Sequence, residues 1–156
     1  MDIRNKSGNI ILSTQGALSR TDLGYAQLSG AVLDQLDLTG VSLDSADLSE
    51  ASLRGTNLYM AFLYGAALRT ADLSNACLRG ADLTKADLRG ANLDDADLSL
   101  SDLYTATKLY GSNFDGASLD KAILVGAEYD ENTRFPPSFD PAKHGMLITT
   151  WSRNKS

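Results

Sequence analysis

The chain has 156 residues, of which 43% are hydrophobic, and this suits one domain with a continuous buried core. The composition excludes collagen-like, mucin-like and low-complexity disordered chains. No apolar run approaches the roughly 18 residues of a membrane-spanning helix, and no signal-peptide segment follows the N-terminal charges, so we expect a soluble, cytoplasmic protein with no membrane association. One cysteine, Cys77, and one histidine, His144, cannot form an internal disulfide or a metal site of the usual nitrogen and sulfur type.

The first 15 residues precede the regular part of the sequence and predict an N-terminal cap. They contain Ile3 and the apolar run Ile10-Ile11-Leu12 on either side of Ser7-Gly8. Apolar segments flanking a short turn are typical of a β-hairpin. We expect this hairpin to cover the first turn of the structure that follows.

Residues 16–131 contain a five-residue repeat. Leucine recurs at every fifth position from Leu18 to Leu103, and after one extra residue the series resumes at Leu109 and ends at Tyr129, which makes about 23 repeats. A small residue, usually Ala, stands two positions before each central residue, with mostly Asp or Asn between them. Nine of the 13 glycines stand two positions after the central residue.

A period of five fits neither regular element. In an α-helix, residues five apart are separated by about 140° around the axis, so the leucines would not share a face. In a continuous strand, an odd period would place successive leucines on opposite faces. The chain must therefore turn within every repeat, with the small residue and the leucine facing one interior and the glycine positions at the corners.

The cleanest repeats, Ala71-Asp72-Leu73, Ala81-Asp82-Leu83, Ala86-Asp87-Leu88 and Ala91-Asn92-Leu93, resemble the A-[DN]-L-x-x pattern of the pentapeptide-repeat family. The resemblance implies an all-β fold, a right-handed quadrilateral parallel β-helix with four repeats per coil and terminal caps. The period of five alone fixes neither the handedness nor the number of sides. The leucine-centred repeats and residues 132–136 are similar to cyanobacterial members of the family.

The register breaks once, at residues 106–109, where one extra residue separates two repeats. We interpret this residue as a bulge at a corner, with no long projecting loop. The other interpretation, tolerated surface variation, stays open because solenoid loops accept insertions easily.

Residues 132–156 leave the repeat and predict a C-terminal cap and tail. This segment carries all three prolines, and Asp140-Pro141 predicts the start of a short helical turn that Gly145 ends. Beyond about Ser152 we expect fraying. The apolar residues expected to cover the last coil are Phe135, Phe139, Met146, Leu147 and Ile148.

No catalytic motif is found in the sequence. There is no nucleophile elbow, no phosphate-binding loop, no dinucleotide-binding glycine pattern and no paired-histidine metal signature. The aspartates that precede the leucines are expected to serve hydrogen bonding and solubility. We therefore predict no enzyme activity, no catalytic residue, no cofactor and no metal.

The charge distribution separates the repeats from the ends. Residues 13–131 carry 18 acidic and 8 basic side chains, a net charge of −10, whereas both ends are net positive. Such a surface repels phosphates, so direct nucleic-acid binding is not expected. The family resemblance implies an alternative function, a DNA-mimic regulator of gyrase or another topoisomerase. The chain departs from those members in its leucine-rich centres and in the expected lack of a projecting loop.

Outward positions of the repeats should be polar, yet a cluster of large apolar residues falls on them. Its members are Tyr59, Met60, Phe62 and Tyr64, and we expect Tyr104 two coils further along the column of Tyr64. Exposed aromatic patches mark interaction sites, so these five residues are a candidate protein-binding patch. Aromatic stacking between coils is the other interpretation.

We therefore predict a non-enzymatic protein-interaction or scaffold module whose partner is another protein of unknown identity. The ends of a β-helix expose backbone edges unless they are covered. We accordingly expect a monomer or an end-to-end dimer.

Overall fold

The corners of the fold are made by the second residue after each central leucine. In the regular repeats the backbone φ at this position lies between +53° and +77°, both for glycine, as in Gly65 at 64°, and for other residues, as in Lys85 at 59°, with Leu100 at the start of the irregular segment as an exception. This left-handed conformation carries no steric cost for glycine and a modest one for other residues. The gathering of glycines at this position follows from that difference. The computed structural model describes residues 1–150.

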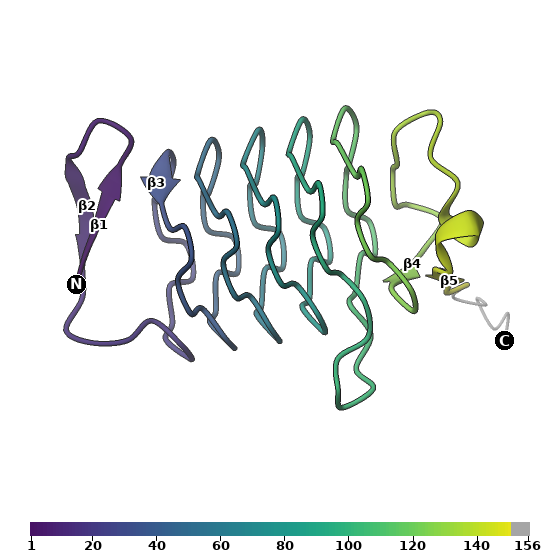
Figure 1. Ribbon diagram of the computed structural model, residues 1–156, viewed down its shortest axis with the longest axis horizontal. Helices are drawn as coiled ribbons and strands as arrows, with labels where there is room; N and C mark the ends of the chain where they lie inside the picture. The colour runs from purple at the N-terminus through teal and green to yellow at the C-terminus, as the bar shows by residue number, and fades with distance from the viewer. Residues whose placement is uncertain (151–156) are drawn as a thin grey trace, which may run out of the picture.

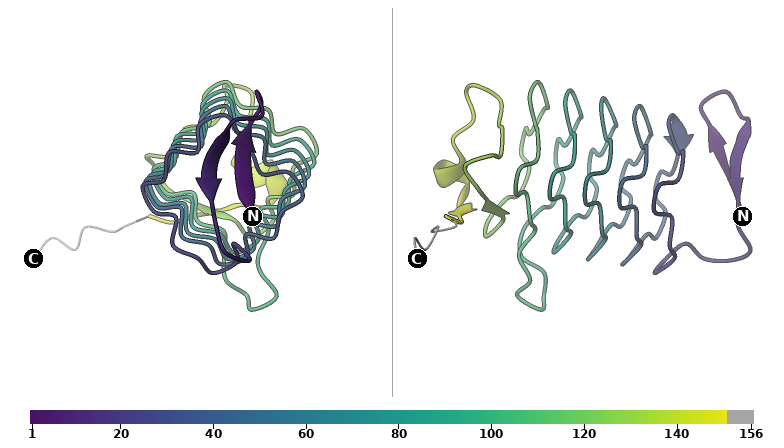
Figure 2. Two further views of the ribbon diagram at one scale, coloured as in Figure 1. Left: turned by 90° about the vertical axis from the view of Figure 1, so that its left-hand side faces the viewer. Right: turned by 180° about the vertical axis from the view of Figure 1, so that it is seen from behind.

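Four repeats complete one coil, and the coils stack by single parallel bridges. As far as the bridge from Cys77 to Asp97, each bridge joins residues 20 apart, so that Ser42 pairs with Phe62 and Phe62 pairs with Asp82, and four such columns run along the rod. Between coils, the N–H of Leu63 donates to the carbonyl of Asp82 at 2.8 Å, and the same pattern recurs in each column. The result is a β-helix-like stack (Figure 1) whose coils superimpose when viewed along the axis (Figure 2).

The interior of the rod is filled by columns of leucine and alanine. From Leu33 to Leu98 every central leucine is at most 1% exposed, and the alanines two positions earlier are equally buried. Where a polar residue takes the alanine position, its hydroxyl is satisfied, since Thr56 donates to the carbonyl of Leu33 at 2.9 Å. Every fully buried leucine contributes roughly 1.5–3 kcal/mol of hydrophobic stabilisation.

A hairpin closes the N-terminal end. Strands β1 (Asp2–Asn5) and β2 (Ile10–Ser13) are antiparallel, and β1 also pairs with β3 (Ala31–Val32) in the first coil. The side chain of Ile3 is 1% exposed and belongs to the core. The hairpin therefore adds its own apolar residue to the interior that it covers.

The C-terminal end is closed by a short parallel pair and one helical turn. Strand β4 (Glu128–Tyr129) pairs with β5 (Leu147–Ile148), and the 3₁₀ helix η1 (Pro141–His144) lies between them in the chain. The carboxylate of Asp140 accepts the N–H of Ala142 at 3.1 Å, and Gly145 ends the turn at φ 69°.

Aromatic packing holds this cap to the last coil. The buried ring of Phe114 stacks on Phe135 at 5.5 Å, and Phe135 stacks on Phe139 at 5.0 Å. Of the residues expected to cover the last coil, Phe135, Phe139 and Met146 pack into or against the core, whereas the side chains of Leu147 and Ile148 are more than half exposed. The predicted fraying beyond Ser152 lies outside the described residues.

The break in register is longer than the sequence predicts. Cys77 pairs with Asp97 at the usual spacing of 20, whereas the next bridge joins Asp82 to Lys108, a spacing of 26. Six residues are therefore inserted, and a loop projects from the rod at the lower edge of Figure 1. Leu103 lies on this loop and is 71% exposed, so it does not belong to the core series.

Candidate functional site

The described residues offer little catalytic chemistry. Within residues 1–150, no group of three or more His, Cys, Asp or Glu side chains is placed to hold a metal ion. No helix in this part of the chain is long and apolar enough to cross a membrane. Cys77 has a free thiol and is half-buried. The candidate sites are a pocket at the C-terminal end and two surfaces of the rod.

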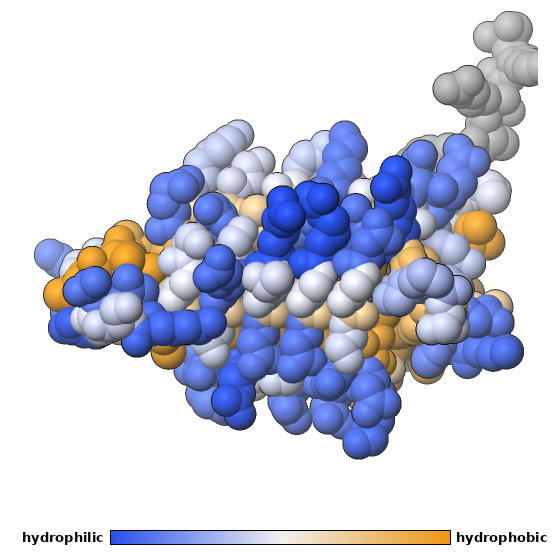
Figure 3. Space-filling view, turned by 90° about the horizontal axis from the view of Figure 1, so that it is seen from above, coloured by the Kyte–Doolittle hydropathy of each residue, from blue (hydrophilic) through white to orange (hydrophobic). Residues whose placement is uncertain are grey.

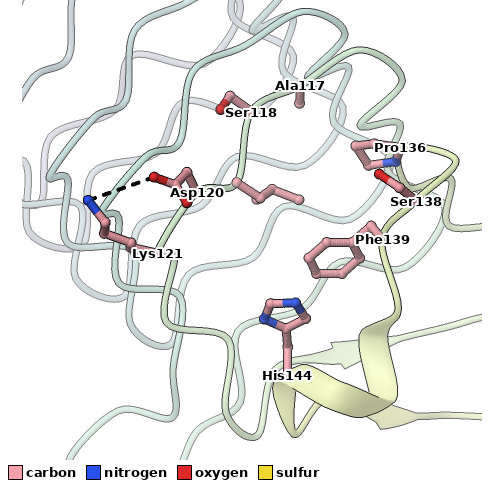
Figure 4. A pocket seen from close by; sticks show the side chains of 9 residues that line it. Ala117, Ser118, Asp120, Lys121, Pro136, Ser138, Phe139 and His144 are labelled. Atoms are coloured by element: carbon pink, nitrogen blue, oxygen red, sulfur yellow. Dashed lines mark ion pairs between the residues drawn. The ribbon is translucent and has the colours of Figure 1, made fainter.

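A pocket of about 330 Å³ lies between the last coil and the C-terminal cap (Figure 4). On one wall Asp120 and Lys121 form an ion pair at 3.8 Å, with both side chains more than 70% exposed. On the other wall the rings of Phe139 and His144 stack at 4.5 Å. Ligand sites are usually enclosed and mostly apolar with a few directed polar groups, and this open, solvated junction does not have that form.

The sequence-predicted residues Tyr59, Met60, Phe62 and Tyr64 lie along one edge of the rod, and we call them the aromatic corner. Phe62 and Tyr64 are 51% and 43% exposed, and Tyr59 and Met60 are half-buried. By contrast, the side of the rod seen in Figure 3, turned away from the projecting loop, is largely hydrophilic along the repeats. The corner thus gathers four large apolar or aromatic side chains on one edge of the rod.

Ring stacking does not explain the aromatic corner. The ring pairs found among residues 1–150 all lie at the C-terminal end and involve Phe114, Tyr129, Phe135, Phe139 and His144. Tyr64 instead lies beneath the ammonium group of Lys85, with Nζ 5.3 Å from the ring centroid. The hydrogen bond with Tyr64 raises the pKa of Lys85, so this lysine stays charged.

Tyr104 does not lie where the sequence predicts. The inserted residues shift the register, so the column of Tyr64 continues through Thr84 to Tyr110. The Tyr110 hydroxyl donates to the Glu128 carboxylate, and burial together with this hydrogen bond raises the pKa of Tyr110. Tyr104 is instead on the inserted loop and is 88% exposed.

The loop nevertheless begins beside the aromatic corner. We define the projecting loop as residues 101–106. A Cβ added to Gly80 would lie 2.6 Å from the Met60 Sδ and 2.9 Å from the Ser101 Cβ, so both side chains meet over this glycine. The corner and the loop therefore form one continuous surface. Sequence reasoning missed Leu103 as a surface residue, although the spacing of 11 between Leu98 and Leu109 was a usable signal.

Internal hydrogen bonds fix the conformation of the projecting loop. The Ser101 hydroxyl oxygen accepts the N–H groups of Leu103 at 3.2 Å and Thr105 at 3.0 Å. The backbone N–H of Ser101 donates to the Thr105 carbonyl at 2.9 Å, and that of Tyr104 donates to the Ser101 carbonyl at 2.9 Å. Ser101 thus closes a tight turn that displays Leu103 and Tyr104 at its tip.

Side chains of the rod hold the base of the loop. The Arg79 guanidinium donates to the Leu100 carbonyl at 3.0 Å and to the Asp102 carboxylate at 2.6 Å, and the bond to Asp102 raises the pKa of Arg79. The Thr107 hydroxyl accepts the N–H of Gly80 at 2.9 Å and so restores the ladder where the loop returns. The loop is therefore clamped on both sides.

The stacked coils and capped ends define a repeat solenoid. The family described as Pentapeptide repeats matches in eight copies, over residues 18–55, 34–69, 46–84 and 66–104. The chain belongs to this family.

Solved structures include similar chains. A pentapeptide repeat protein from Nostoc PCC 7120 is 35% identical over 84% of this chain and 86% of that one, with a TM-score of 0.44. HetL, involved in heterocyst differentiation regulation in the cyanobacterium Nostoc sp. strain PCC 7120, is 36% identical over 73% and 56%, with a TM-score of 0.32. QnrB1, a plasmid-mediated fluoroquinolone resistance protein, is 16% identical over 86% and 92%, with a TM-score of 0.34. No curated protein matches the chain.

Proposed function

We propose that this protein is a non-enzymatic protein-interaction or scaffold module that acts in the cytoplasm. Its frame is a right-handed quadrilateral β-helix, present as a monomer or an end-to-end dimer. The observation that carries the proposal is the aromatic corner, where Phe62 and Tyr64 expose large rings without stacking on other aromatic side chains. Apolar patches of this kind on polar surfaces are typical of binding sites.

The frame suits display because it is stiff. The corner residues project from repeats whose leucines are fully buried and whose backbone is hydrogen-bonded to the coils on both sides. A partner therefore meets side chains attached to a fixed backbone. Binding to a preorganised surface loses less conformational entropy than binding to a flexible one.

The test is capture of a partner on the immobilised protein. The triple variant Tyr59→Ser, Phe62→Ser, Tyr64→Ser is compared with wild type and with the control Arg69→Ser, Thr70→Ser, which alters exposed positions on another column. Lysate of the cells that produce the protein is passed over each, and retained proteins are identified. We expect one protein to be retained by wild type and control and lost by the triple variant. Equal retention on all three would contradict the proposal.

A second candidate function is a DNA-mimic regulator of gyrase or another topoisomerase. Two observations favour it. Residues 13–131 carry a net charge of −10, and the rod has a projecting loop, a feature of the DNA-mimic members that the sequence did not predict for this chain. Purified gyrase tests it directly. A mimic should alter supercoiling in a salt-dependent way, because charge drives the contact, and unchanged supercoiling at low salt excludes it.

A further inference from the structure

The tip of the projecting loop is the most conspicuous apolar feature outside the core. Leu103 and Tyr104 are 71% and 88% exposed, yet the turn that carries them is closed by the Ser101 hydrogen bonds. Tyr104 has φ 59°, the same left-handed conformation that the corner residues of the regular repeats adopt, so the loop turns as tightly as a corner of the rod. Neither side chain contributes to the core, so the fold gains little from either of them.

We propose that Leu103 and Tyr104 insert together into an apolar pocket of a partner protein, and that lysine or arginine residues border this pocket. The proposal rests on the interaction function given above and names the anchor residues and the chemistry of the partner. Tyrosine is among the residues that carry most binding energy at protein interfaces, and a fixed loop presents it with little loss of entropy.

The shape of the surface favours a concave partner. The loop projects from the rod (Figure 1), and an apolar residue lies on either side of its base, Met60 on one side and Val125 on the other. Met60 meets Ser101 over Gly80 on one side, and on the other side Val125, which is 59% exposed, accepts the N–H of Leu100 at 3.3 Å. A pocket that receives the tip would therefore cover Met60 and Val125 as well, and this produces the desolvated centre that tight interfaces share.

The charges around the loop favour a basic rim. Arg79 is neutralised by Asp102 and Asp97, at 2.6 and 3.8 Å, and Lys108 is paired with Asp82 at 3.7 Å. Arg79 and Lys108 are thus already paired with carboxylates, while the repeats over residues 13–131 carry a net charge of −10. Opposite potentials across an interface accelerate and stabilise association.

The same charge argues against two other occupants. A second copy of the chain, which carries a net charge of −6, would bring acidic repeats against acidic repeats, and this opposes pairing along this edge. An anionic lipid surface would be repelled in the same way, although a leucine and a tyrosine could enter a bilayer. A protein surface with an apolar pocket and a basic rim complements both the apolar tip of the loop and the acidic repeats.

Photo-cross-linking tests the proposal with the full chain. Tyr104→p-benzoylphenylalanine keeps an aromatic side chain at the tip, and Thr70→p-benzoylphenylalanine places the same probe on another exposed column. Both are irradiated in lysate of the producing cells. We expect position 104, and not position 70, to form an adduct with one identified protein, at a peptide that lines an apolar pocket bordered by Lys or Arg. Adding Leu103→Ser should reduce the yield about tenfold, the loss expected when one hot-spot side chain is truncated.

Every other outcome overturns the inference. If the partner captured by wild type is captured equally well by Leu103→Ser, Tyr104→Ser, the proposed function stands and the loop is not the anchor. The proposed partner is excluded if the cross-linked protein has an acidic or flat surface at the adduct. It is equally excluded if the adduct is a homodimer, or if the protein sediments with phosphatidylserine vesicles and forms no protein adduct. If neither probe nor wild-type capture yields a protein, the inference and the proposed function both fail.

Discussion

Replacing Gly80 with alanine tests how the projecting loop is joined to the rod. Gly80 has φ 68°, and an added Cβ would lie 2.6 Å from the Met60 Sδ and 2.9 Å from the Ser101 Cβ. Gly65 is the matched control, since its φ is 64° and the nearest atom, the Ser45 Oγ, is 3.6 Å away. The two substitutions therefore share a backbone cost and differ in the space available.

The expected magnitudes follow from these distances. Alanine in the left-handed conformation costs about 1–2 kcal/mol, which is the whole effect at Gly65. Gly80→Ala adds overpacking, typically about 1–3 kcal/mol more. The Met60 sulfur is at the end of a flexible chain and can move away. Ser101 cannot move without disturbing the hydrogen bonds that close the loop, so most of the additional cost comes from this contact.

Equilibrium urea unfolding followed by circular dichroism measures the difference. Gly80→Ala should lose about 1–3 kcal/mol more than Gly65→Ala, at an unchanged dependence on urea. The double variant Met60→Ala, Gly80→Ala should retain most of that loss. Equal free energies of unfolding for the two glycine variants would refute the contact between loop and rod, and full recovery in the double variant would assign the clash to Met60 alone.

Three further predictions address the loop, the acid response and the C-terminal cap. The double variant Leu103→Ser, Tyr104→Ser should change the free energy of unfolding by less than about 0.5 kcal/mol because both side chains are exposed. In the same urea titration, Leu98→Ala at a fully buried site should cost about 2–5 kcal/mol. A large loss from the double variant would place Leu103 in the core. Burial raises the pKa of Asp130, but hydrogen bonds from the Gly111 N–H, the Thr133 hydroxyl and Asn132 outweigh this effect, so the net pKa is lowered. The stabilisation by the Asp130 carboxylate is therefore fully present above about pH 4 and is lost as the pH falls through the lowered pKa. Asp130→Asn should accordingly flatten the fall in stability below about pH 4, measured as urea midpoints across pH, and an unaltered acid profile would contradict this. Phe135→Ala removes the ring between Phe114 and Phe139 and should cost about 3–5 kcal/mol. The loosened cap should unfold locally more often, so trypsin should cleave faster after the already exposed Lys143, and unchanged cleavage would show that the cap does not depend on the stack.

The regular part of the fold was predictable because a period of five leaves the chain few choices. Residues five apart share a side only if every repeat turns, and the leucine and alanine columns are indeed buried. The Asp before each leucine also has a local role, since the carboxylate of Asp47 accepts the N–H of Ser49 at 3.0 Å and that of Asp72 accepts the N–H of Ser74 at 3.1 Å. Family membership comes from the matched repeats, and the period alone does not specify handedness.

The candidate site was predictable only where it lies inside the regular repeats. The aromatic corner follows from counting outward positions over residues 59–64, because no insertion interrupts them. Tyr104 was assigned by the same counting, and the assignment failed because counting assumes that the register continues. Tyr110 occupies the column position expected for Tyr104, six residues later in the chain.

The physical reason for the longer insertion lies in the order of the four columns. A one-residue bulge after Leu103 would keep Leu103 inside and move each later repeat to the next side of the rod. The six-residue insertion lets Thr107 take the inner position, where its hydroxyl accepts the Gly80 N–H, and it places Phe114 where its ring stacks on Phe135. Sequence periodicity cannot weigh these distant contacts, because Leu103 fits the five-residue spacing equally well. Residues 101–106 match the repeat in sequence but leave it in the structure, so Leu103 is exposed instead of buried in the core. Such conflicts between local sequence pattern and fold are expected at functional positions.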